Sequence, residues 1–268
     1  MTKIPRLYFT FGLLISSIII ADLRWDLAAA MATPWSVIQQ RGRLVVGVSP
    51  KSPPFSSQDA QGQWSGFEID LARQLAADLL GSKEKVEFIP LTPRQRLSTL
   101  QSGTVDLVIS QMTITTNRAR LVDFSLGYYT DSTVIVHAPQ YVPPSRQRIG
   151  ILKGSDNIAL VQQQFPEAAM IGLDSYTQGW TALQSAQIDY LAGDYSALLP
   201  WLKPTAPALS PRYTMINKPL SRRSWGIALP RGLQHNDTRQ KVFQAVQTWR
   251  SNGWLDQQAK RWGVILPN

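Results

Sequence analysis

Short apolar runs typical of buried strands alternate with helical patterns along most of this 268-residue chain. In the first half, the expected elements are strands over 43–48, 86–89 and 105–109, with helices over 67–80 and 94–101. The helix over 67–80 is the clearest, because Phe67, Leu71, Leu75 and Leu79 recur every four residues and Gly81 ends the pattern. A β-α-β-α-β order predicts an α/β fold with a parallel or mixed sheet and crossover helices.

The second half repeats this plan without an internal repeat of fixed period. Strands are expected over 133–136, 149–152, 170–173, 188–192 and 225–229, and helices over 158–165, 177–185, 238–252 and 254–262. Asp237 or Thr238 is the expected cap of the helix that ends before Gly253.

The N-terminus has the layout of a secretory signal. Lys3 and Arg6 precede an apolar run over 7–21, and small residues follow over 28–32. We therefore expect residues 1–32 to be a signal peptide and the remainder to be exported to the periplasm. The charged patch over 22–26 leaves an uncleaved N-terminal anchor open. The chain contains no cysteine, so disulfides and a lipidated cysteine are both excluded.

Charge gives a weaker constraint. The formal net charge is +9, from 27 basic and 18 acidic residues. Export and the scattering of the basic residues argue against nucleic acid as a partner. We find neither an acidic or histidine-rich metal cluster nor a glycine-rich phosphate loop in the sequence, so we expect no cofactor.

A threonine-rich turn after the strand over 105–109 is the best candidate for a binding site. Thr116 or Asn117 can cap a short helical turn that carries Arg118. Such a turn offers backbone N–H groups, hydroxyls and a guanidinium to a small carboxylate. Asp194, at the end of a predicted strand, is a candidate partner for an ammonium group.

Motifs along the chain together resemble the bacterial solute-binding protein family 3, the polar amino acid-binding proteins of ABC importers. They are the segments 66–72, 100–103, 113–115, 122–125, 128–129 and 260–263, with Asp106, Arg118, Gly154, Asp189, Asp194 and Gly253. The resemblance covers about 43–263 and implies the two-lobed periplasmic binding protein type II fold. It places lobe 1 at 36–131 plus 222–268 and lobe 2 at 132–221. Hinges are expected near 131–133 and 222–225, and the lobes are expected to close around a ligand.

The resemblance also implies the ligand-binding residues. Arg118 and Thr113 would hold the carboxylate of an amino acid, and Asp194 its ammonium. The segment Ser110–Gln111 would supply a carbonyl, and the turn with Ser155 and Asp156 would supply N–H groups from lobe 2. Trp64 is a further candidate near the cleft entrance.

The chain departs from the family's pattern where specificity is expected. Ser49 and Ser52 stand where relatives often have an acidic or aromatic residue, and Pro93 where they often have an aromatic one. The loss of the acid favours a small neutral or acidic amino acid over arginine or lysine.

We therefore expect a monomeric, non-enzymatic receptor that passes a polar amino acid to an ABC permease of the inner membrane. One alternative is an exported cyclohexadienyl dehydratase on the same fold, with Glu68 or Asp194 as its acid. Another is a ligand-sensing domain.

Overall fold

A computed structural model describes residues 34–137, 147–202, 213–215 and 219–264. The expected signal segment 1–32 lies outside the described residues. Among the residues described, we find no helix with the length and apolar character needed to cross a membrane.

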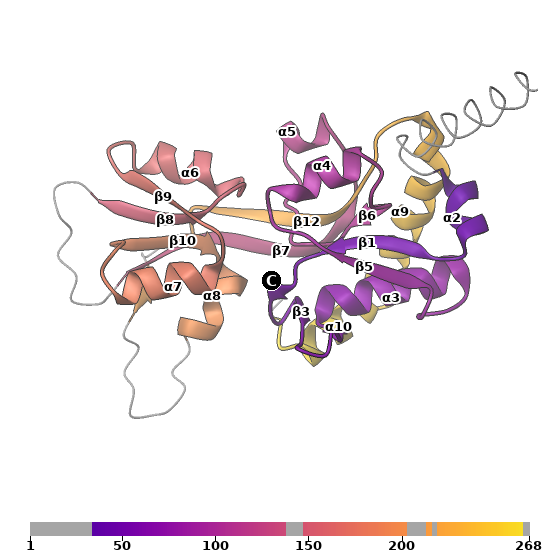
Figure 1. Cartoon of the computed structure of the whole chain (residues 1–268), viewed down its shortest axis with the longest axis horizontal. Helices are drawn as coiled ribbons and strands as arrows, with labels where there is room; N and C mark the ends of the chain where they lie inside the picture. The colour runs from indigo at the N-terminus through magenta and orange to yellow at the C-terminus, as the bar shows by residue number, and fades with distance from the viewer. Residues whose placement is uncertain (1–33, 138–146, 203–212, 216–218, 265–268) are drawn as a thin grey trace, which may run out of the picture.

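A mixed nine-stranded sheet forms the backbone of the molecule, in the order β5-β1-β6-β12-β7-β10-β8-β9, with β11 paired to β7. Its strands are β1 Leu44–Val48, β5 Val86–Pro90, β6 Leu107–Val108, β7 Asp123–His137, β8 Arg148–Leu152, β9 Ala169–Leu173, β10 Tyr190–Asp194, β11 Thr214–Met215 and β12 Ser221–Leu229. A second sheet contains β2 Lys51–Ser52, β3 Ser56–Gln58 and β4 Trp64–Ser65. The long antiparallel pair β7 and β12 runs through both halves of the molecule (Figure 1).

Helices cover both faces of the sheet in each half (Figure 1). The first half carries α2 Trp35–Arg41, α3 Phe67–Leu80, α4 Gln95–Gln101, α5 Thr116–Ala119, η1 Leu233–His235, α9 Asn236–Ser251 and α10 Trp254–Arg261. The second half carries α6 Asn157–Gln164, α7 Tyr176–Gln184 and α8 Tyr195–Leu202.

The α3 helix shows how the local sequence determines an element. Leu71 and Leu75 are fully buried on its apolar face. Gly81 ends the helix in the left-handed conformation, at φ 80°, and its N–H donates to Ala77 O. In its first turn, Asp70 accepts a 2.8 Å hydrogen bond from Trp262 Nε1. The helix is therefore attached both to the sheet and to the C-terminal helices.

The predicted α/β class, mixed sheet and two-lobed architecture are confirmed, and α3 has the predicted bounds. The strand predicted over 133–136 is much too short, because β7 begins at Asp123 and its first ten residues mix buried and half-buried positions without regular alternation. The helices α2 and α8 were not predicted. His235, rather than Asp237 or Thr238, directly precedes α9.

The lobe boundaries stay a prediction. The predicted hinge segments 131–133 and 222–225 lie opposite each other on β7 and β12, where Arg222 pairs with Ser132 and Trp225 with Tyr129. Two neighbouring strands thus provide the connection on which a hinge motion would act.

Candidate functional site

The carboxyl ends of parallel strands place several predicted residues at one edge of the sheet. β1 pairs in parallel with both β5 and β6, and Gly47 lies opposite Val108. Ser49 therefore leaves β1 at the edge where Ser110 leaves β6. The hydroxyl oxygens of Ser49 and Ser52 are 2.7 Å apart, so these two serines bond to each other.

A hydroxyl caps the short helix α5 and positions Arg118. Thr115 Oγ1 accepts a 3.3 Å hydrogen bond from Arg118 N, so Thr115 is the cap, one residue before the predicted Thr116 or Asn117. The guanidinium turns back, and its Nη1 donates to Thr113 O at 3.1 Å. The turn thus holds Arg118 against the threonine-rich segment, as an anion receptor requires.

Asp156 of the second half already contacts this receptor. Its Oδ1 accepts hydrogen bonds from Arg118 Nη1 and from Thr113 Oγ1, both at 3.2 Å. Its Oδ2 lies 2.8 Å from Arg223 Nη1. The side chains of Arg118 and Asp156 are only 12% and 16% exposed. A carboxylate of the chain itself therefore lies on the two groups predicted to bind a ligand carboxylate.

Asn157 connects this ion pair to the predicted ammonium site. Its Oδ1 accepts a 2.7 Å bond from Arg223 Nη2, and its Nδ2 donates to Asp194 Oδ1 at 3.1 Å. Ser155 Oγ accepts from Asn157 N at 3.2 Å, which gives Ser155 a local role at the start of α6. One polar network therefore reaches from Arg118 to Asp194.

Asp194, the last residue of β10, is held by neutral donors. Tyr176 OH donates to Asp194 Oδ2 at 2.9 Å and accepts from Asp194 N at 3.0 Å. Burial raises the pKa of Asp194, and the charge of nearby Asp156 adds to the increase. A ligand ammonium beside this carboxylate would lower the cost of ionising it.

Asp131 is a second buried acid at this place, and the sequence analysis used it only as a hinge boundary. It accepts from Ser132 N at 2.7 Å, and the hydroxyl of Ser196 donates to it through a short bond. Burial, followed by the charge of Asp194, raises the pKa of Asp131 to about 7. The described residues therefore place two acids close together where one was predicted.

A third cluster surrounds the buried Glu68. Its carboxylate accepts from Gln111 N at 2.6 Å and from the hydroxyl of Tyr128. Burial raises the pKa of Glu68, and the charge of Arg96 opposes the increase. Gln111 has a positive φ of 47°, and both Gln111 and Ser110 are buried. Arg96 is also buried. Its burial was not predicted, because nothing in the sequence distinguishes it from Arg94 on the same predicted helix.

Trp64 takes a packing position. Its ring lies 5.7 Å from the ring of Phe88, and its carbonyl accepts a 3.2 Å bond from Arg73 Nη2. These contacts support a structural role, and its predicted contact with the ligand stays untested.

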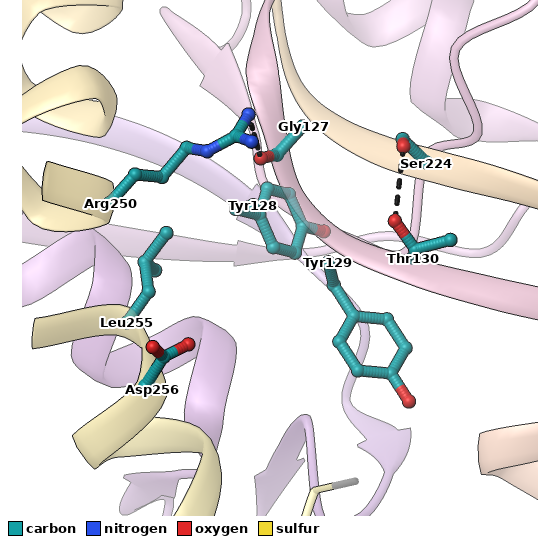
Figure 2. Close-up of a pocket in the computed structure, with 8 residues that line it drawn as sticks. All are labelled: Gly127, Tyr128, Tyr129, Thr130, Ser224, Arg250, Leu255 and Asp256. Carbon is teal, nitrogen blue, oxygen red and sulfur yellow. Dashed lines mark hydrogen bonds between the residues drawn. The ribbon is translucent and has the colours of Figure 1, made fainter. Parts of the chain in front are cut away.

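A separate cavity of about 360 Å³ lies where β7 and β12 meet α9 and α10 (Figure 2). It is lined by Gly127, Tyr128, Tyr129, Thr130, Ser224, Arg250, Leu255 and Asp256. Arg250 Nη1 donates weakly to Gly127 O at 3.5 Å, and the hydroxyls of Thr130 and Ser224 are 3.2 Å apart. None of the ten predicted ligand-binding residues lines this cavity, so it is distinct from the charged network.

The structure thus brings five predicted residues into one network, namely Thr113, Arg118, Ser155, Asp156 and Asp194. Ser49 and Ser52 form a pair of their own, and Ser110 and Gln111 lie by Glu68. Sequence analysis missed the residues that join these groups: Arg96, Asp131, Asn157, Tyr176 and Arg223. Only contacts between distant segments show their roles.

Comparisons with known proteins agree with this architecture. The family model of the bacterial extracellular solute-binding proteins, family 3, matches residues 44–265. The chain is 27% identical to the ABC transporter glutamine-binding protein of Bacillus subtilis (strain 168), over 85% of this chain and 83% of that protein.

Solved structures give the same result. The L-cysteine solute receptor of Neisseria gonorrhoeae superposes with a TM-score of 0.76 at 27% identity, covering 86% of this chain and 93% of that chain. An ancestral amino acid-binding protein, described as a precursor of cyclohexadienyl dehydratase, superposes with a TM-score of 0.74 at 26% identity. That match covers 84% of this chain and 96% of the ancestral one. The match to the family model spans nearly all of the described residues, and the predicted family is confirmed: this chain belongs to the bacterial extracellular solute-binding proteins, family 3.

Proposed function

We propose that this protein is a receptor that captures a polar amino acid between its two lobes and delivers it to an ABC permease. The relatives named above that bind glutamine or cysteine support this class of ligand. In this proposal the ammonium of the amino acid lies against Asp194 in lobe 2, and its carboxylate lies against an arginine of lobe 1.

One observation carries the proposal: opposite charges face each other from the two lobes within a single buried network. Arg118 comes from the segment after β6, Asp194 ends β10, and Asp156 with Asn157 connects them. A zwitterion has the same two charges, and a closed cleft removes water from both, so each needs a partner. The arrangement suits a zwitterionic ligand better than a neutral or singly charged one.

Location and partners belong to the same proposal. The chain belongs to an extracellular solute-binding family. We propose that it works in the periplasm as a monomer, without a cofactor, and that residues 1–32 direct its export. Its partner would be a permease of the inner membrane.

The decisive test is calorimetric titration of residues 33–268 with each of the twenty amino acids. The protein should first be unfolded and refolded to remove any amino acid that copurifies with it. We expect one-to-one binding of one or a few polar amino acids. No binding across the panel would refute the proposal.

The dehydratase alternative has one observation in its favour, the similarity to the ancestral precursor of cyclohexadienyl dehydratase. Its reaction needs a positioned acid. Glu68 has a raised pKa, but it is fully buried and already accepts from Tyr128 and Gln111. Burial also raises the pKa of Asp194, the other candidate acid, and its two oxygens already accept from Tyr176 and Asn157. We therefore propose binding without catalysis, and incubation with arogenate and prephenate should give no turnover.

A further inference from the structure

We propose that the cavity in Figure 2 is a second binding site, which takes a small zwitterion such as a free amino acid and favours closure of the cleft. The site is distinct from the charged network of the cleft, because no residue of that network lines the cavity. Occupation of this site does not depend on the proposed function, whereas its effect on the cleft does.

The walls of the cavity join the predicted hinge to the C-terminal helices. Thr130 of β7 and Ser224 of β12 lie in or beside the hinge segments, and Arg250 of α9 and Asp256 of α10 lie across the cavity from them (Figure 2). The register of β7 and β12 shifts directly after Trp225. Such a bulge interrupts the ladder and bends the strand, so the cavity adjoins a place where the hinge strands change course.

Two side chains of opposite charge line the cavity without an ion-pair partner. In the described part of the chain, neither Arg250 nor Asp256 forms an ion pair. Arg250 donates only to Gly127 O, at 3.5 Å, which is at the limit of a hydrogen bond. The carboxylate of a zwitterion would pair with Arg250 and its ammonium with Asp256. The lining therefore suits a molecule with both charges better than a molecule with one.

Hydroxyl groups add to this lining. The hydroxyl oxygens of Thr130 and Ser224 are 3.2 Å apart, so one hydroxyl donates to the other. The hydrogen of the accepting hydroxyl stays free to donate to a bound molecule, and both oxygens keep lone pairs that can accept from it.

The size and exposure of the cavity indicate a weak site. Its volume of about 360 Å³ lies within the range of small-molecule sites, about 300–1,000 Å³. Arg250 and Asp256 are exposed, so water screens their charges and each ion pair would contribute little. We therefore expect affinity in the millimolar range, so that the site fills only when the amino acid is abundant.

The strand segment that lines the cavity also reaches the cleft. The hydroxyl of Tyr128 donates to Glu68, which accepts from the backbone N–H of Gln111, one of the predicted ligand-binding residues. The phenol of the next residue, Tyr129, hydrogen-bonds with the side chain of Ser196, at the start of α8 in the predicted second lobe. A change in the course of this strand would therefore move groups on both sides of the cleft.

The form in which the cavity exists gives the sign of the coupling. In this structure the pair of Arg118 and Asp156 joins the two predicted lobes. A molecule that fits the cavity in this form stabilises it against an open one. By linkage, the same molecule raises the affinity of the cleft for its own ligand.

Amide NMR spectra detect the second site in wild-type protein saturated with the amino acid that binds the cleft most tightly. Each of the twenty amino acids is then added at millimolar concentrations. We expect at least one of them to shift the amide signals of Gly127, Thr130 and Ser224 with one-to-one saturation. No such shift with any amino acid would overturn the proposal.

Charge-neutral variants locate the site. Arg250→Gln and Asp256→Asn should each weaken the second binding by about 3-fold, and the double variant should weaken it by about 10-fold, as expected for exposed ion pairs. Asp237→Asn and Lys260→Gln remove exposed charges from the same two helices outside the cavity and should leave it unchanged. Equal losses in the cavity variants and the controls would overturn the site.

Two derivatives of the amino acid that fills the second site identify the paired charges. Its α-carboxamide lacks the carboxylate and should bind the wild-type protein and Arg250→Gln equally. Its N-acetyl derivative lacks the ammonium and should bind the wild-type protein and Asp256→Asn equally. A derivative that still loses affinity in its matched variant would contradict the assignment.

Calorimetric titration of the cleft ligand tests the coupling. Without the second amino acid, the wild-type protein and the double variant should bind the cleft ligand equally. With that amino acid in excess, we expect the wild-type protein to bind it tighter than the double variant by about 5-fold or more. Equal affinities under this condition would overturn the coupling. Failure of the proposed function is distinguishable, because the cleft would then bind no amino acid while NMR titration of the ligand-free protein would still show the second site.

Discussion

The buried acid Asp131 should make the ligand-free protein less stable at high pH, and Asp131→Asn should remove this effect. In the folded protein the pKa of Asp131 is raised to about 7, by burial first and then by the charge of Asp194. The ordinary pKa of an aspartate in an unfolded chain is about 3.9. Because the folded state holds the proton more tightly, this group contributes stability that is fully present below about pH 4. That stability is lost as the pH rises through about 7.

The size of the effect follows from the shift. The pKa of Asp131 in the folded protein is about 3 higher than in the unfolded chain. At about 1.4 kcal/mol for each pKa unit, this difference lowers the free energy of unfolding by about 4 kcal/mol between pH 4 and pH 8.5. Asp131 is only 4% exposed, so solvent screens little of this cost. Some of the cost is shared with Asp194, whose pKa is also raised by burial. We therefore expect Asp131→Asn to be more stable than the wild-type protein by about 2–4 kcal/mol at pH 8.5 and about equal to it at pH 4.

Urea unfolding at both pH values measures this difference, with circular dichroism and tryptophan fluorescence followed together to check that unfolding is two-state. The protein must be free of ligand, because an ammonium in the cleft would favour the ionised acids. Glu84→Gln, which removes an exposed acid of the same lobe, serves as the control and should change stability by less than about 0.5 kcal/mol. The reasoning is refuted if Asp131→Asn is less stable than the wild-type protein at pH 8.5, or if its advantage is the same at both pH values.

Three further predictions concern the cleft and the core. Asp194→Ala should weaken amino acid binding by about 2–5 kcal/mol in calorimetry, because it leaves the buried ammonium unpaired; unchanged affinity would remove Asp194 from the site. Gly66→Ala should reduce the yield of folded protein or cost at least about 3 kcal/mol, because φ is 131° and the added Cβ would meet a backbone carbonyl at 2.2 Å. Gly81→Ala, with nothing within 4 Å of the added carbon, should cost only about 1 kcal/mol, and equal costs at the two glycines would contradict this reasoning. Leu75→Ala should cost about 2–5 kcal/mol in urea unfolding, while Leu233→Ala, at a side chain 90% exposed, should cost almost nothing.

The elements of the fold were predictable where a short local pattern determines them. The spacing of apolar residues in α3 and the glycine after it were sufficient to predict both of its ends. The strand β7 was not recognised over its full length, because its first ten residues, 123–132, mix buried with half-buried positions. Tertiary pairing with β12 forms this part of the strand, and no local pattern reports such pairing.

The family resemblance predicted several residues of the site but not the contacts between them. The residues that the family resemblance assigned, Arg118, Thr113 and Asp194, do lie in one network, but their partners could not be inferred. Asp156 was expected to offer a backbone N–H, and its side chain instead pairs with Arg118, which lies 38 residues away in the chain. Whether a carboxylate binds an arginine of the other lobe depends on how the lobes meet.

The charges of the cleft also indicate how the empty protein can close. In the predicted division, Arg118 belongs to lobe 1 and Asp156 to lobe 2, while Arg223 of β12 contacts both Asp156 and Asn157. Opening the lobes would break the pair of Arg118 and Asp156, whose other oxygen lies 2.8 Å from Arg223 in the predicted hinge segment. Opening would therefore break a nearly buried ion pair and the hydrogen bond from Thr113 to Asp156, and water would solvate the separated charges in their place. Because solvation of the separated charges offsets much of what a buried ion pair contributes, a ligand that binds only between closed lobes can shift the populations of the open and closed forms with part of its binding energy.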